Sequence, residues 1–214
     1  MSTVQDTRDT GVVAHTVEAP PAPPAADPSL LGLPVFIAGS LALGFSLIDF
    51  LPAAASAGIL PIVMFANGLG LVLATAWAIS LGQSVVASIF GVFAGFWLSY
   101  AALVLGLTHG WFAITGATNI SDTVGTFLLC WTLIIGVLTV ATLRLPSSFT
   151  LLLALVTLAL ALVTFATFET HPNISKLAGY VVFAFAANGV YLFLSATTVA
   201  LGGRGYPLGR AVLR

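Results

Sequence analysis

Six long apolar stretches dominate this sequence, and each is long enough to cross the hydrocarbon core of a membrane as a helix. They cover residues 29–50, 57–81, 84–107, 122–144, 148–169 and 176–201. Crossing that core takes about 20 helical residues, and lipid offers no hydrogen-bond partner to an open backbone. Because only 6% of the residues are charged and 59% are hydrophobic, a water-soluble domain is excluded. The sequence therefore predicts an all-α membrane protein, a six-transmembrane-helix bundle embedded in the lipid bilayer.

The segments outside these stretches predict the domain boundaries. Residues 1–26 contain a proline-rich run and too few apolar residues for a core, which indicates a disordered cytoplasmic tail. The transmembrane domain covers residues 27–203. Residues 204–214 follow as a short basic cytoplasmic tail.

Basic residues predict the orientation in the membrane. Six spans bring both ends of the chain to the same side. That side carries Arg144, Arg204, Arg210 and Arg214, whereas the other side carries Lys176. Positive residues favour the cytoplasmic side. We therefore expect a multi-pass protein of the plasma membrane with both termini in the cytoplasm.

The charged and metal-binding residues exclude several classes of function. The carboxylates near the membrane all fall at predicted helix ends, and they are Asp27, Asp49, Asp122 and Glu169. A proton relay or ion-driven pump normally uses an ionisable residue at mid-depth. The single Cys130 and three scattered histidines have no metal-ligand spacing, so no metal or other cofactor is expected. Nothing pairs a nucleophile with a base, which argues against an enzyme, and a net charge of -1 argues against nucleic acid.

The polar residues within the predicted spans are mostly uncharged. On the last span Asn188, Tyr191, Ser195 and Thr198 recur at helical spacing, and Asn67 lies near the middle of the second span. A second set, Thr150, Thr157 and Thr164, recurs every seven residues on the fifth span. Such residues either bond between membrane helices or line a path. For Asn67, Asn188 and Tyr191 the sequence leaves both interpretations open.

Two short motifs occur in the first and third spans. The chain reads Asp27-Pro28-Ser29-Leu30-Leu31-Gly32-Leu33 at the start of the first span and Gly95-Phe96-Trp97-Leu98-Ser99-Tyr100-Ala101 in the third. Together they resemble the acetate uptake transporter family, also called the succinate-acetate permeases. The family begins with Asn-Pro-Ala-Pro-Leu-Gly-Leu and carries a Tyr-Gly-x-Phe-Trp stretch. With the six spans and Tyr191, the likeness covers about residues 27–201.

The resemblance implies six-helix protomers that assemble into ring-shaped homo-hexamers, each protomer with its own path. In the family this path is narrowed by a Phe, a Tyr and a Leu. By position these residues correspond to Phe36, Phe93 and Val156, so two of the three differ. An acidic residue of the family is replaced by Ala78. The implied constriction is drier than that of the family.

The predicted function is a membrane channel or proton-linked transporter for small monocarboxylic acids, namely acetate, with succinate as a further candidate. Such an acid is more than roughly 99% ionised at pH 7, because its pKa is near that of a Glu side chain. An apolar constriction therefore favours passage of the protonated acid, or of anion and proton together, with Asn67, Asn188 and Tyr191 donating hydrogen bonds. The alternatives are a facilitative channel for a neutral solute such as urea or a short amide, and an accessory membrane subunit without a path.

Overall fold

The computed structural model describes residues 26–213, so the predicted disordered tail, apart from Ala26, and Arg214 lie outside the described residues. In chain order the elements are α1 (Ser29–Leu47), the 3-10 helix η1 (Ala53–Ile59), the π-helix η2 (Ile62–Leu69), α2 (Gly70–Ser80), α3 (Ser84–Thr108), α4 (Ala117–Ala141), the 3-10 helix η3 (Thr142–Arg144), α5 (Ser147–Glu169) and α6 (Pro172–Ala200). Six helical stretches within this range are long and apolar enough to span a membrane. The prediction of a multi-pass, six-helix protein is confirmed.

Two helices begin earlier than the apolar pattern predicts. The fourth starts at Ala117 instead of residue 122, after Gly116 with a φ of 87°, which places Asp122 inside the helix and not at its end. Its first residues are polar, and a helix that leaves the lipid can continue through polar residues. The sixth starts at Pro172 instead of residue 176. Proline is well tolerated at the first position of a helix, because an N–H there would have no partner within the helix.

The second span is a composite of three helix types. It was expected as one continuous helix over residues 57–81, but η1, η2 and α2 follow one another there. Pro61 precedes the π-helix and has no N–H to donate to the preceding turn. A π-helical stretch is uncommon and often occurs at functional sites. Here it contains the completely buried Asn67.

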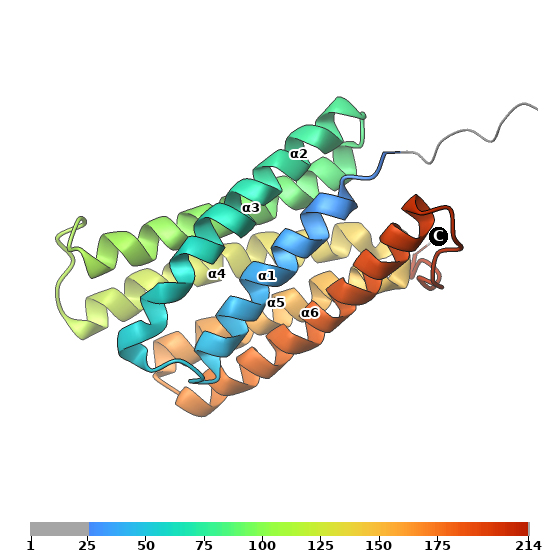
Figure 1. The fold of residues 1–214 in the computed structure, drawn as a ribbon. Helices are drawn as coiled ribbons and strands as arrows, with labels where there is room; N and C mark the ends of the chain where they lie inside the picture. The colour runs from blue at the N-terminus through green and yellow to red at the C-terminus, as the bar shows by residue number, and fades with distance from the viewer. Residues whose placement is uncertain (1–25, 214) are drawn as a thin grey trace, which may run out of the picture.

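The helices pack as two groups of three that meet at α1 and α6. In the first group α1 packs on η2 and α2, and α2 packs on α3; in the second, α5 packs on both α4 and α6 (Figure 1). Between α3 and α4 the backbones make few close contacts. Aromatic rings fill that space instead, namely Phe96 and Tyr100 of α3 against Phe127 and Trp131 of α4.

Threonines join α4 to α5 in a row that we call the threonine seam. The hydroxyls of Thr132 and Thr164 lie 3.1 Å apart, and those of Thr139 and Thr157 lie 2.8 Å apart. At the end of the row, the Thr150 hydroxyl donates to the carbonyl of Thr142 over 2.8 Å. The seven-residue spacing on the fifth span therefore marks a helix–helix contact.

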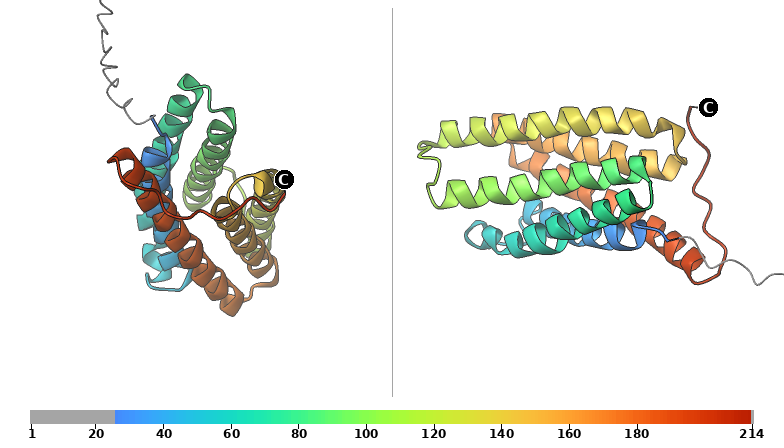
Figure 2. Two further views of the ribbon diagram at one scale, coloured as in Figure 1. Left: turned by 90° about the vertical axis from the view of Figure 1, so that its right-hand side faces the viewer. Right: turned by 90° about the horizontal axis from the view of Figure 1, so that it is seen from above.

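Both described ends of the chain lie at the same end of the bundle, opposite the loop between α3 and α4 (Figure 1). Residues 204–213, which we call the C-terminal strap, cross that end from α6 toward α4 and α5 (Figure 2). The strap is bound by the protein: the backbone N–H of Ser148 donates to the Leu208 carbonyl over 3.0 Å, and that of Leu213 to the Leu143 carbonyl over 2.9 Å.

Candidate functional site

Two apolar cavities lie in series inside the bundle and share Phe36 and Phe93 as a common wall. The cavity toward the chain ends, here called the terminal cavity, has a volume of about 180 Å³ and is lined from the first turns of α1, α3 and α5. The other, here called the central cavity, has a volume of about 30 Å³ and lies among α1, α3, α5 and α6. Among the described residues that line either cavity, none is ionisable.

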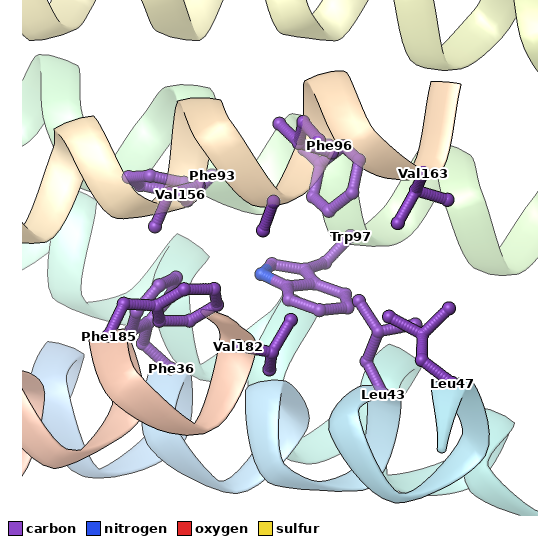
Figure 3. A pocket seen from close by; sticks show the side chains of 12 residues that line it. Phe36, Leu43, Leu47, Phe93, Phe96, Trp97, Val156, Val163, Val182 and Phe185 are labelled. Carbon is purple, nitrogen blue, oxygen red and sulfur yellow. The ribbon is translucent and has the colours of Figure 1, made fainter. Parts of the chain in front are cut away.

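Phe36, Phe93 and Val156 meet at the central cavity, although they come from three different helices (Figure 3). The ring centroids of Phe36 and Phe93 are 5.0 Å apart, and all three side chains are at least 95% buried. The structure thus brings together the three residues that the resemblance implies for a constriction.

Phe185 of α6 joins this group, with its ring centroid 5.7 Å from that of Phe36. Phe185 was not predicted from the sequence, because the prediction for the last span was based on its polar residues. The signal was available as helical spacing: Val182, Phe185, Gly189 and Leu192 recur at steps of three and four and are all buried.

Trp97 is the one indole in the wall of the central cavity. The side chain is 2% exposed, and its Nε1 atom has no hydrogen-bond partner. Figure 3 shows this nitrogen on the side of the ring that faces Phe36, Phe185 and Val156. The neighbouring Phe96 packs edge-on against the indole at a centroid distance of 4.9 Å and lines the same cavity.

Asn67, the mid-span residue of the second span, lies outside both cavities. Its amide is completely buried, and neither its nitrogen nor its oxygen has a partner. It packs against Gly39 of α1, where a Cβ atom would overlap the amide. The glycine therefore makes room for the Asn67 side chain.

Asn188 and Tyr191 bond to the protein at the end that holds the chain termini. The Asn188 amide donates to the Ser148 carbonyl over 2.8 Å, and the Tyr191 hydroxyl donates to the Pro207 carbonyl of the C-terminal strap over 2.8 Å. On the same face, Ser195 Oγ accepts from the backbone N–H of Tyr206. Neither residue lines the two cavities, so a role of this face in a path stays a prediction.

The residues of the first motif shape the start of α1. Asp27 accepts a hydrogen bond from the Ser29 N–H over 2.9 Å, and Pro28 is buried beside it. A Cβ on Gly32 would overlap the Phe90 ring, so a larger residue there would displace that ring. Leu33 lines the terminal cavity, and Leu31 packs against the core.

The second motif supplies one wall of the central cavity. Phe96 and Trp97 both line it. Gly95 faces α4, where an added Cβ would lie 3.3 Å from the Trp131 ring. The motif therefore combines a cavity wall with a close helix contact.

An ion pair joins the segment after α1 to the first turns of α6. At the end away from the chain termini, Lys176 Nζ lies 3.1 Å from a carboxylate oxygen of Asp49, and both side chains are largely exposed. Exposed pairs of this kind contribute at most about 1 kcal/mol of stability.

The model of the GPR1/FUN34/yaaH family matches residues 10–200. The chain belongs to this family. This assignment confirms the resemblance to acetate uptake transporters that the two motifs indicate, because the relatives include proteins named for acetate.

Two curated fungal relatives match the chain in part. Accumulation of dyads protein 2 of Saccharomyces cerevisiae is 30% identical over 131 residues, which are 58% of this chain and 45% of that protein. Acetate transporter protein patA of Aspergillus clavatus is 29% identical over 137 residues, 63% of this chain and 55% of that protein. The chain thus spans about half the length of these relatives.

A solved structure shares the fold. The structure of the bacterial acetate channel SatP superimposes with a TM-score of 0.75 at 21% identity, covering 86% of this chain and 99% of that one. At this identity the match shows the six-helix architecture.

Proposed function

We propose that this chain forms a channel or proton-linked transporter for small monocarboxylic acids, with acetate as the first substrate to test and succinate as the second. The observation that carries the proposal is the pair of cavities in series, which meet at Phe36 and Phe93 inside the bundle. Phe36, Phe93 and Val156 are the proposed constriction. The names of an Aspergillus acetate transporter and a bacterial acetate channel among the relatives support the choice of substrate.

The chemistry of the lining favours an uncharged passenger. Both cavities are apolar, and their lining residues include no lysine or arginine. Moving a bare carboxylate into such surroundings costs several kcal/mol or more, whereas the protonated acid avoids most of that cost. The acid therefore passes protonated, or its anion passes together with a proton.

Uptake of radiolabelled acetate into proteoliposomes at several external pH values tests this proposal. For an acid with a pKa near 4.3, the neutral fraction rises about ten-fold for each unit by which the external pH is lowered, as long as the pH stays well above that pKa. We expect protein-dependent uptake to rise steeply from pH 7.5 to pH 5. Protein-free liposomes are the essential control, because neutral acetic acid also crosses lipid. Uptake above this control that stays flat with pH would contradict passage of the protonated acid.

A neutral solute such as urea or a short amide is the second candidate, and the absence of ionisable groups from the lining residues favours it. Stopped-flow permeability of urea and of acetate in the same vesicles distinguishes the two. Urea permeability without acetate permeability would select this candidate. If neither solute crosses faster than in protein-free vesicles, an accessory subunit without a path is the remaining interpretation.

The proposal includes a ring-shaped hexamer in the plasma membrane with both termini in the cytoplasm. The common position of the two described chain ends supports one location for both. The outward face of α4 supports assembly, because it is apolar and exposed: Leu129, Leu133, Ile134, Val137 and Val140. Native mass spectrometry from nanodiscs tests the hexamer. Reporters fused to the N-terminus or inserted at residues 109–116 test the orientation.

A further inference from the structure

We propose that Trp97 binds the substrate: its indole N–H donates a hydrogen bond to the carboxyl group of a short monocarboxylic acid held in the central cavity. The inference rests on the proposed function and extends it by naming the donor and the number of carboxyl groups that the cavity accepts.

Trp97 combines an unpartnered donor with a position in the cavity wall. Within the described part of the chain, the buried side-chain polar atoms without a partner are the two amide atoms of Asn67 and Nε1 of Trp97. Asn67 lies outside the cavities, whereas Trp97 lines one of them. An indole nitrogen can only donate, and leaving a buried donor unpaired destabilises the fold. A ligand that accepts this hydrogen bond recovers that cost.

The surrounding rings hold the indole in place. Phe96 packs edge-on against it, and Tyr100 lies nearly perpendicular to it at a centroid distance of 6.4 Å. At 2% exposure the side chain is enclosed. The N–H is therefore directed at the space beside Phe36, Phe185 and Val156 (Figure 3), before any ligand arrives.

The cavity matches a small acid with one carboxyl group. The carbonyl oxygen of the acid accepts from Trp97, and its alkyl group contacts apolar side chains such as Phe36, Val156 and Val182. A dicarboxylic acid would place its second carboxyl group against the same apolar wall without a donor. The central cavity, at about 30 Å³, also leaves little room for the longer molecule. We infer a preference for acetate over succinate that is set at Trp97.

The direct test replaces Trp97 with 3-benzothienylalanine, in which sulfur takes the place of the N–H and the ring keeps its size. Since a net hydrogen bond contributes about 1 kcal/mol, we expect the KM for acetate uptake in proteoliposomes to rise about five- to ten-fold. The same replacement at Trp131, whose ring packs outside both cavities against Phe96, is the matched control and should leave the KM unchanged.

A second measurement uses the unmodified side chain. In 15N-Trp-labelled protein at pH 5, titration with acetate should shift the indole N–H resonance that is missing from a Trp97→Phe variant, and succinate should shift it less. If wild-type protein carries acetate but the Trp97 replacement leaves the KM unchanged or the indole resonance does not move, this inference fails alone. If wild-type protein carries no acetate, the proposed function and this inference fail together.

Discussion

The threonine seam and the wall of the central cavity use polar groups in opposite ways. In the seam, hydroxyls of α4 and α5 face one another, and each also lies 2.7–2.9 Å from a carbonyl oxygen of its own helix: Thr132, Thr139, Thr157 and Thr164. In the cavity wall, the polar atom of Trp97 has no partner. Both regions lie inside the same apolar bundle.

The difference separates packing from ligand chemistry. A polar side chain in a membrane helix contributes to helix association when it bonds to a partner on another helix. Its donor is then no longer available to a solute. A buried donor without a partner is costly to the fold. Its presence beside a cavity is therefore the stronger indication of binding.

The largest expected effect comes from filling the central cavity. Val156→Phe adds a ring at the proposed constriction, where Val156 is 5% exposed, and we expect acetate uptake to fall by about ten-fold or more, since each 1.36 kcal/mol added to the barrier is a factor of ten. Val72→Phe on α2 is the matched control, because Val72 is 42% exposed and lines neither cavity. Equal uptake by the two variants would contradict a path through this cavity.

The second effect concerns Asn67, which with Trp97 is one of the two buried polar side chains without a partner among residues 26–213. Gly39→Ala should lower stability by about 1–3 kcal/mol, because the new methyl group overlaps the Asn67 amide. Adding Asn67→Ala should restore most of that loss, and thermal unfolding of the four proteins in detergent measures the coupling. Because Asn67 lies outside both cavities, Asn67→Ala alone should leave acetate uptake unchanged; a large change would give this residue a part in the path.

Removing a hydroxyl from the threonine seam should lower stability by less than Gly39→Ala does, and it should leave acetate transport unchanged. Thr157→Val keeps the side-chain shape and removes the bond to Thr139, for which we expect a loss of about 0.6 kcal/mol, a typical value for such bonds between membrane helices. The unfolding midpoint should fall slightly while the KM for acetate stays at its wild-type value. Altered uptake would mean that the seam and the cavity are coupled.

The smallest effect is expected at the C-terminal strap. Tyr191→Phe removes the hydrogen bond to the Pro207 carbonyl, and the bond lies near the protein surface, so we expect a loss of at most about 1 kcal/mol. Proteolysis at residues 204–213 should become faster, because the strap loses one of its attachments. Cleavage at the wild-type rate would show that the remaining hydrogen bonds, from Ser148, Leu143 and Ser195 to the strap, are sufficient to hold it.

Much of the fold follows from the sequence, because lipid leaves a long apolar stretch no other backbone conformation than a helix. The change of helix type within the second span could not be predicted, because the apolar pattern does not distinguish α-helical from π-helical hydrogen bonding. The early start of α4 was missed for a related reason: Thr118, Asn119 and Ser121 are polar, yet they lie in the helix.

The candidate site was predictable only through resemblance. Position in the family pattern pointed to Phe36, Phe93 and Val156, and the structure places them at one cavity. The orientation of an indole ring and the absence of a partner for its nitrogen depend on neighbours from other helices, and no local sequence signal reports them. The same holds for Asn188, whose amide bonds to a carbonyl forty residues away in the chain.

The wall between the two cavities consists of the side chains Phe36 and Phe93, which both cavities share. A barrier made of two rings can open by side-chain rotation, which moves far fewer atoms than a movement of whole helices. We therefore expect solute to pass without a cycle of inward-open and outward-open states. Cross-linking the helix ends to one another should then slow transport far less than it slows a carrier that must rock between two conformations.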